Sequence, residues 1–180
     1  MLDIKKEKWI LFIGSLLLFL IKTHVVFIIV FLLFPFIFIK HLFLIYFIIF
    51  FILLLYGFAI VSFSKRVKDY QIVKYFVYSS IFLILFFLVE FNFPLIFLYV
   101  GIDFSNPIMF IIFFAIFWLI IRLNGVFTSM YLEKFYNYTN ESLFLLASKL
   151  IYYSSYVGAH FIFFTLVPIS FFKLNKRKEV

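Results

Sequence analysis

Long apolar runs separated by short clusters of charge are the main pattern along this chain. Residues 42–61 contain no charged side chain, and a helix needs roughly 20 such residues to cross about 30 Å of hydrocarbon. A membrane β-barrel would instead require segments of about 10 residues that alternate apolar and polar positions. Since lipid offers no hydrogen-bond partners, a helix, which pairs its own backbone groups, is favoured. The pattern predicts an all-α, polytopic helical transmembrane bundle.

The runs divide the chain into about six hydrophobic helices, with a range of five to seven. The predicted segments are residues 9–21, 25–39, 42–61, 72–102, 108–132 and 143–172. The first two would each reach only about 20 Å at 1.5 Å per residue, which is short of a full crossing. They are interpreted either as a re-entrant hairpin around Lys22, Thr23 and His24 or as one kinked crossing.

Composition supports a single integral membrane domain over residues 1–180, with no separate soluble domain. Of the 180 residues, 67% are hydrophobic and only 13% are charged, which is far outside the range of soluble globular proteins. The net charge of +8 is not gathered into a groove with interleaved aromatic residues, so nucleic-acid binding is not expected. The absence of cysteine from the sequence excludes disulfides, thiolate metal sites and thiol nucleophiles.

The amino-terminal residues resemble a signal peptide in having a basic region followed by a 13-residue apolar stretch. No pair of small residues with the spacing of a cleavage site follows Leu20. We therefore expect this stretch to be retained as a helix.

The cations lie between the apolar runs, as expected for cytoplasmic loops that face anionic lipid. The clusters comprise Lys5, Lys6, Lys8, Lys65, Arg66, Lys68, Lys173, Lys176, Arg177 and Lys178. They predict a multi-pass protein of the cell membrane with a cytoplasmic amino terminus. The connection that holds Asp103 and Pro107 has no cation and is assigned to the outer side, which places residues 122–142 inside. The carboxyl terminus would also lie inside only if residues 143–172 cross twice.

Residues 133–142, EKFYNYTNES, form a markedly polar segment that we expect to be a loop. The segment contains two N-glycosylation triplets, which begin at Asn137 and Asn140. Charge places this loop inside, where it would not be modified. Glycosylation of either asparagine would invert the predicted topology.

Glu90, in the stretch FFLVEFNFPLIF, is the one carboxylate inside a long apolar run. A charge at mid-membrane costs at least ~2.5 kcal/mol, so such a residue is a candidate functional site. A helix that begins near Tyr70 would place Glu90 about 30 Å farther on, at the opposite interface. Pro94 disfavours helical geometry in the residue before it. We expect Glu90 and Asn92 to mark the end of a helix, and the alternative is an ion or proton site inside the bundle.

The sequence contains few residues that could bind a cofactor or carry out catalysis. Haem held between facing helices would take two imidazoles as ligands. His24 and His41 lie beside lysines at segment boundaries, and His160 has no evident partner at equal depth. Paired carboxylates, phosphate-binding glycine loops and hydrolase triads are absent from the sequence. We expect no catalytic residues, no metal and no cofactor.

Small residues are concentrated in the last apolar segment, although the chain has only five glycines. They are Ala147, Ser148, Ser154, Ser155, Gly158 and Ala159. Spacings of four residues in this set, such as Ser154 with Gly158, match the small-xxx-small pattern that lets two helix backbones approach closely. This face is predicted to pack against another helix, either in the same chain or in a partner.

Residues 126–174, VFTSMYLEKFYNYTNESLFLLASKLIYYSSYVGAHFIFFTLVPISFFKL, resemble the closing portion of an uncharacterised and largely archaeal membrane family, the domain of unknown function 996. A weaker similarity covers residues 53–84. The resemblance implies a polytopic fold without an established activity, and hence no catalytic residues to transfer. It also implies that residues 143–172 divide into two helices near Gly158.

Two functions remain open from the sequence. Aromatic-rich apolar surfaces and short polar connections favour a non-enzymatic accessory or assembly subunit that contacts other membrane proteins. The alternative is a small channel or transporter component that uses Glu90 and Asn92, because a pore needs polar groups at mid-depth.

Overall fold

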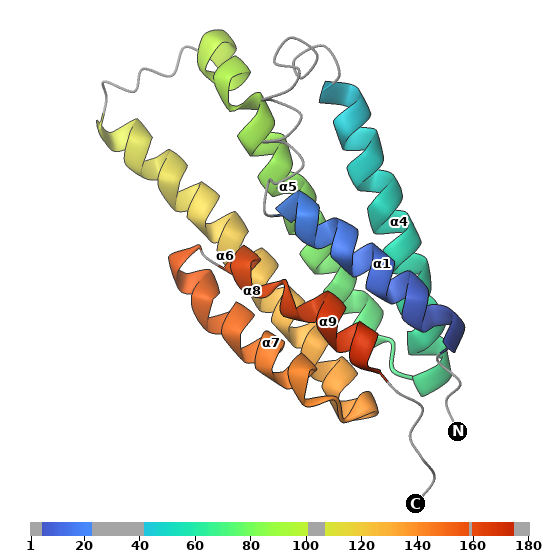
Figure 1. Cartoon of the computed structure of the whole chain (residues 1–180). Coiled ribbons are helices and arrows are strands. Elements are labelled where there is room, and N and C mark those ends of the chain that lie inside the picture. The colour runs from blue at the N-terminus through green and yellow to red at the C-terminus, as the bar shows by residue number, and fades with distance from the viewer. Residues whose placement is uncertain (1–4, 23–41, 101–106, 159, 175–180) are drawn as a thin grey trace, which may run out of the picture.

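The computed structural model describes residues 5–22, 42–100, 107–158 and 160–174, and these residues are helical apart from short turns (Figure 1). The elements are α1 (Lys5–Lys22), α4 (Leu42–Val67), α5 (Gln71–Val100), α6 (Pro107–Thr139), α7 (Ser142–Ser154), the 3-10 helix η1 (Ser155–Val157), α8 (His160–Phe163) and α9 (Leu166–Lys173). Side chains of residues 5, 6, 21, 22, 42–45, 90–100, 110 and 161 are not described. The segment predicted at residues 25–39 lies outside the described residues.

Within the described ranges, three helices are long and apolar enough to cross a membrane. These spans are Tyr46–Val67, Gln71–Val89 and Pro107–Thr139. The all-α prediction is confirmed for this part of the chain, and the spans indicate a multi-pass integral membrane protein. The total number of crossings remains a prediction.

Helix α5 runs past Glu90 and Pro94 to Val100. The prediction that the helix ends near Glu90 is therefore wrong. Proline is tolerated inside transmembrane helices because neighbouring groups can pair with the backbone that it leaves unpaired. The side chains of Glu90 and Asn92 lie outside the described set, so their role as an ion or proton site stays a hypothesis.

Helix α6 continues through most of the predicted polar loop and ends at Thr139. The loop prediction is wrong for residues 133–139 because the apolar stripe of α6 continues through them. Tyr131, Leu132 and Phe135 are buried, and their spacing places them on one helix face. The chain reverses direction only at Asn140, whose φ is 53°. The carboxylate of Glu141 then caps α7 by accepting from the Leu143 N–H.

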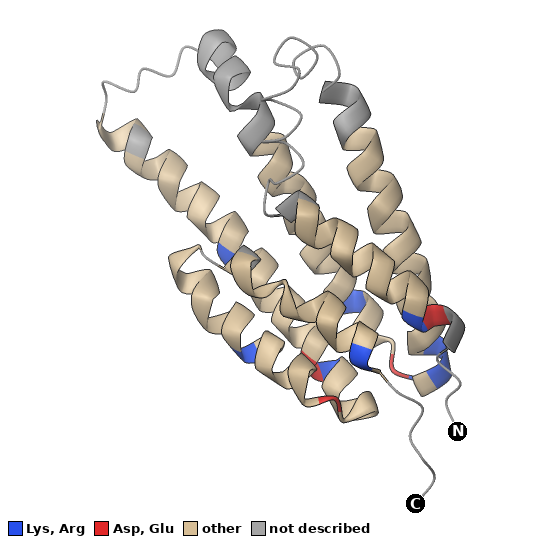
Figure 2. Ribbon diagram, viewed as in Figure 1, with Lys and Arg blue, Asp and Glu red and all other residues tan. Residues whose placement is uncertain are grey.

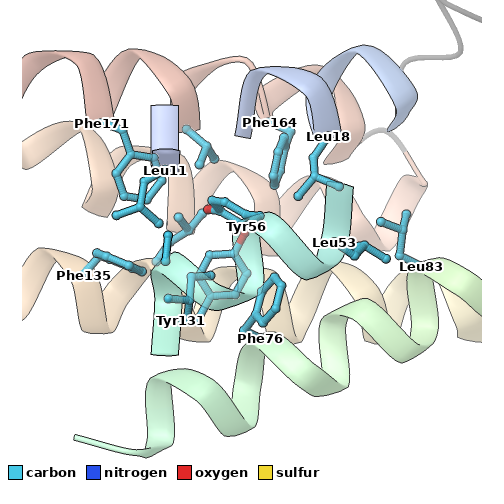
Figure 3. Packing of buried hydrophobic residues seen from close by; sticks show 14 of the residues in the cluster. Leu11, Leu18, Leu53, Tyr56, Phe76, Leu83, Tyr131, Phe135, Phe164 and Phe171 are labelled. Carbon is cyan, nitrogen blue, oxygen red and sulfur yellow. The ribbon is translucent and has the colours of Figure 1, made fainter. Parts of the chain in front are cut away.

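A cluster of aromatic rings joins the helices at the core (Figure 3). The Phe135 ring of α6 lies 4.4 Å from Phe63 of α4, 5.5 Å from Phe144 of α7 and 5.1 Å from Phe171 of α9, between ring centroids. Tyr56 of α4, fully buried, lies 5.4 Å from Phe76 of α5. Stacked and edge-to-face pairs of this kind stabilise by about 0.5–1.5 kcal/mol beyond the area that they bury. Because lipid is as apolar as these side chains, such close packing is what holds membrane helices together.

Positive charge gathers where α1 begins, where α4 ends and where α9 ends (Figure 2). We call this region, with Lys8, Lys65, Arg66, Lys68 and Lys173, the lysine-rich end. An ion pair of 2.6 Å between an Arg66 Nη and a Glu7 Oε joins α4 to α1 there. The Trp9 and Phe172 rings, 6.3 Å apart, join α1 to α9. The amino-terminal, Lys65 and Lys173 positions thus share one end of the bundle, and the side of the membrane that this end faces remains a prediction.

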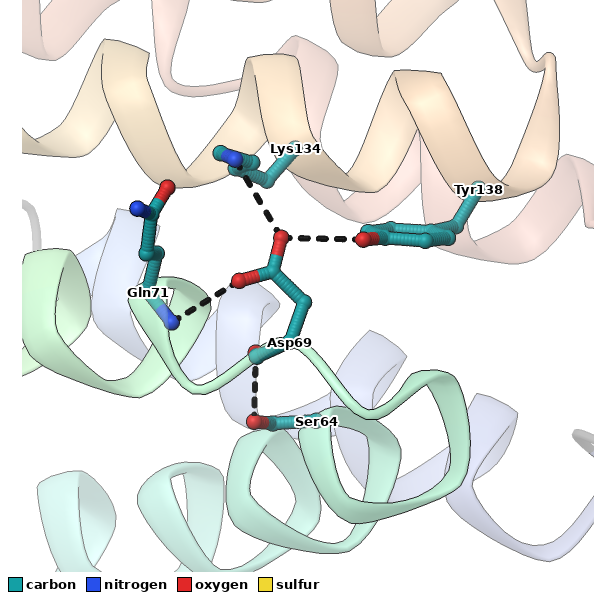
Figure 4. Close-up of polar contacts among 5 residues, drawn as sticks. All are labelled: Ser64, Asp69, Gln71, Lys134 and Tyr138. Atoms are coloured by element: carbon teal, nitrogen blue, oxygen red, sulfur yellow. Dashed lines mark hydrogen bonds and ion pairs between the residues drawn. The ribbon is translucent and has the colours of Figure 1, made fainter.

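The turn between α4 and α5 is closed by Asp69 (Figure 4). Its Oδ1 accepts from the Gln71 N–H at 2.9 Å, and its Oδ2 accepts from the Tyr138 hydroxyl at 3.0 Å and pairs with Lys134 Nζ at 3.2 Å. Its backbone oxygen accepts from the Ser64 hydroxyl at 2.7 Å. Burial alone would raise the pKa of Asp69. The hydrogen bonds from Gln71 and Tyr138 and the charge of Lys134 outweigh it, so the pKa lies below its ordinary value.

The Asp69→Asn variant tests this turn. A lowered carboxyl pKa contributes stability that is complete above the ordinary value of about 4 and is lost as the pH falls through the lowered value. We expect the variant to lower the free energy of unfolding by about 0.5–1 kcal/mol at pH 7, the range of a solvent-accessible pair. Thermal unfolding in detergent between pH 3 and pH 7 should show the difference from wild type shrinking at the acid end. Glu133→Gln, at an exposed position on α6, serves as the control, and a pH-independent difference for Asp69→Asn would contradict the assignment.

Candidate functional site

Buried polar side chains meet in the middle of the bundle, between α5, α6, η1 and α8. We call them the central polar cluster, and they are Ser79, Arg122, Asn124, Thr128, Ser155 and His160. All are buried, and Arg122, at 9% exposed, is the most accessible of them. Polar residues inside a membrane bundle are costly and are therefore the first place to look for function.

Arg122 lies midway along α6 and points at the end of α7. One Nη donates to the Tyr152 backbone oxygen at 3.0 Å and to the Ser155 hydroxyl. The guanidinium carbon lies 4.6 Å from the centre of the Tyr152 ring and 3.5 Å from that of Tyr156. The faces of both rings therefore attract the positive charge of the guanidinium. Arg122 thus lies within the candidate span Pro107–Thr139, and its charge is compensated inside the bundle. The assignment of residues 122–142 to the inner side of the membrane stays a prediction.

Asn124 links three helices through its amide. Its Nδ2 donates to the Ser79 backbone oxygen of α5 at 2.6 Å, and its Oδ1 lies 3.1 Å from Nε2 of His160. The Ser79 hydroxyl is 2.7 Å from that of Thr128, one turn farther along α6. His160, which the sequence left without a partner, therefore belongs to a hydrogen-bonded chain.

Gly125 lets α6 and η1 approach each other. A Cβ added there would lie 2.4 Å from the Ser155 Cβ and 3.4 Å from the His160 Cγ. Both neighbours are held by the chain of hydrogen bonds that surrounds them. The close approach brings the polar groups of α6 within reach of the end of α7.

The last apolar segment breaks where the resemblance implied. Helix α7 ends at Ser154, and Gly158 adopts a left-handed φ of 74° between η1 and α8. The Trp118 indole N–H of α6 donates to the Tyr156 backbone oxygen at 2.9 Å. Segment 143–172 is thus a hairpin of two arms, α7 and α8–α9.

This break divides the predicted small-residue face, because only part of it lies on α7. Ala147, Ser148, Ser154 and Ser155 are buried. Gly158 lies beyond the end of α7, so its spacing of four from Ser154 does not form a helical face. Ala159 lies outside the described residues.

Other sequence candidates are not brought into the cluster. The lysine-rich end holds Lys8 near the start of α1, Lys65, Arg66 and Lys68 at the end of α4, and Lys173 at the end of α9. Lys5 and Lys6 have no described side chains, and His24, His41, Lys176, Arg177 and Lys178 are outside the described ranges. Over those ranges, no group of three or more His, Cys, Asp or Glu residues is placed to hold a metal ion.

Arg122 and Asn124 are the residues that sequence reasoning missed. The available signal was a cation and an amide two positions apart inside an otherwise apolar stretch, which marks an intramembrane site by default. In the fold they form a fixed positive charge beside a chain of hydrogen bonds that includes one titratable group, His160. This arrangement can hold the end of α7 in place and offers polar groups deep in an apolar bundle.

Comparisons with protein-family models, curated proteins and solved structures give no match to this chain. The resemblance to the domain of unknown function 996 therefore stays a hypothesis.

The Gly125→Ala variant tests the close approach of α6 and η1. The added methyl group must displace the Ser155 Cβ, and overpacking of this kind costs about 1–3 kcal/mol. Gly57→Ala is the matched control, because the nearest atom there is the edge of the Phe76 ring at 2.9 Å, at the far end of a side chain, whereas at Gly125 it is the Ser155 Cβ, which is fixed to the backbone. We expect Gly125→Ala to lower the unfolding temperature in detergent clearly more than Gly57→Ala does. Equal effects would show that the two elements are not tightly packed.

Proposed function

We propose that this chain is a non-enzymatic accessory or assembly subunit of a larger membrane complex. The amino-terminal half of α6 carries the proposal, because large apolar side chains are exposed over most of its surface. These residues are Ile108, Met109, Ile111, Ile112, Phe114, Ile116, Trp118 and Leu119. At 3.6 residues per turn these positions cover most of the helix circumference, and the remaining stripe is the half-buried one of Phe113 and Phe117.

Among the described residues, the ring contacts of this half-helix to α5 centre on Phe117. The Phe117 ring stacks on Phe86 of α5 at 5.2 Å and on Phe113 at 6.1 Å. Beyond these contacts, α5 and α6 diverge toward the end opposite the lysine-rich end (Figure 1). Membrane helices associate through close contact between shaped surfaces. An aromatic-rich half-helix with large exposed apolar side chains therefore suits the transmembrane helix of a partner protein.

Purification from the native membrane in mild detergent, followed by mass spectrometry, tests the proposal. We expect one or more membrane proteins in stoichiometric amounts. A photo-crosslinking residue at Ile111, 65% exposed, should capture that partner, whereas one at Phe58 of α4, 81% exposed, should capture mainly lipid. Recovery of this chain alone, without a crosslinked protein at Ile111, would contradict the proposal.

A small channel or transporter component is the second candidate. The central polar cluster favours it, since a conduction or transport path needs polar groups at mid-depth. The same proposal assigns the ion or proton site to Glu90 and Asn92. Purified protein in vesicles would then carry an ion flux that Glu90→Gln reduces at least tenfold. A flux equal to that of protein-free vesicles would exclude this candidate.

A further inference from the structure

We propose that residues 142–173 form a re-entrant hairpin, which enters and leaves the membrane on the side of the lysine-rich end. Its tip, marked by η1 and Gly158, would lie near the middle of the bilayer. This inference concerns how the chain is threaded through the membrane, and it is independent of the proposed function.

The arms are too short to cross. Helix α7 has 13 residues and is about 20 Å long at 1.5 Å per residue. The returning arm, from His160 to Lys173, is of similar length. A crossing requires about 30 Å of hydrocarbon, so each arm covers roughly two thirds of it.

The open ends of the two arms lie together. Helix α7 begins just after α6 ends, and its Phe144 ring lies 4.9 Å from Phe171 of α9. At the end of α9, the Phe172 ring lies 5.5 Å from Phe12 of α1 and 5.8 Å from the Lys8 ammonium. These contacts bring the first turn of α7 and the last turn of α9 to the lysine-rich end.

The tip lies deep relative to that end. Gly125, which meets Ser155, is about 14 Å along α6 from Lys134 at 1.5 Å per residue. Lys134 pairs with Asp69 in the turn between α4 and α5. If this ion pair marks the interface, the tip lies close to half of the roughly 30 Å hydrocarbon thickness.

The outer face of the hairpin suits lipid. Its exposed large side chains include Leu146, Tyr153, Val157, Ile162 and Ile169. Lys149 is the exposed cation on α7, about 10 Å from the start of the helix. A lysine at that depth can extend its ammonium to the interface.

A hairpin tip in hydrocarbon needs partners for its irregular backbone. Helix α6 supplies them from two successive turns: Trp118 donates to the Tyr156 oxygen, and Arg122 donates to the Tyr152 oxygen. Arg122 is thus a positioning residue that holds the tip against α6. This role accounts for the buried charge of Arg122 without requiring a bound ligand.

Cysteine labelling can test the threading directly, because the chain has no native cysteine. Single variants Ser142→Cys and Lys173→Cys report the open ends, and Val157→Cys, at 78% exposed, reports the tip. Lys65→Cys and Ile108→Cys report the two ends of the bundle. A membrane-impermeant maleimide is applied to sealed vesicles of known orientation, from either side.

We expect the Ser142, Lys173 and Lys65 variants to label from the same side, and the Ile108 variant not to label from that side. The Val157 variant should label at least tenfold more slowly than the Ser142 variant from either side, and should react fully after detergent is added. Labelling of the Ser142 and Lys173 variants from opposite sides would overturn the hairpin. Rapid labelling of the Val157 variant in intact vesicles would overturn its depth.

Arg122→Met in the Val157→Cys background tests how the tip is held. We expect labelling at position 157 to rise at least fivefold, with a smaller rise for Arg122→Lys, which keeps one donor group. Lys149→Met, which removes the exposed cation of α7, should leave the labelling rate at position 157 unchanged. Labelling of Lys65→Cys in the same background verifies insertion. An unchanged rate for inserted Arg122→Met would refute the positioning role.

Discussion

Every backbone N–H and C=O group inside hydrocarbon must find a partner within the protein, and the architecture of this chain depends on that constraint. Continuous helices satisfy it in α4, α5 and α6. Where a helix begins after a break, carboxylates accept hydrogen bonds from backbone N–H groups. Asp69 accepts from the Gln71 N–H at the start of α5, and Glu141 accepts from the Leu143 N–H at the start of α7. Both of these breaks lie at the lysine-rich end, where water can also form hydrogen bonds with backbone groups.

The break after Ser154 is different because it lies deep in the bundle. There Trp118 of α6 donates to the Tyr156 oxygen, and the Tyr152 oxygen accepts from both Arg122 of α6 and the Ser155 hydroxyl. A central arginine costs about 2.5–3.5 kcal/mol on insertion scales, and hydrogen bonds from a charged donor return about 1.5–3 kcal/mol. With the two tyrosine rings around it, the guanidinium is close to fully compensated. The cation and the hairpin thus stabilise each other.

Helix α6 has two halves with different surroundings. Its carboxyl-terminal half carries Arg122, Asn124, Gly125 and Phe135, and it contacts α5, α7 and α8 through them. Its amino-terminal half is covered with exposed apolar side chains. The buried half explains the shape of the bundle, and the exposed half is the reason for proposing a partner protein. Helix α6 therefore both organises the packing of the bundle and carries the surface to which the proposed partner would bind.

By itself, the sequence determined the fold class. Apolar runs of about 20 residues require helices in lipid, and runs of charge predict which connections share a side. The break near Gly158 was also anticipated, through a resemblance. These features depend on local composition and on chain length, which a sequence displays directly.

Only the tertiary structure decided where the helices end and which polar groups meet. Residues 133–139 look like a loop, yet they are helical because Phe135 packs among rings from α4, α7 and α9. Pro94 looks like a helix end, yet α5 continues beyond it. Arg122 and His160 lie 38 positions apart in the sequence. Both belong to the central polar cluster because the hairpin folds back on α6. Such contacts depend on spatial neighbours, which the order of residues along the chain does not reveal.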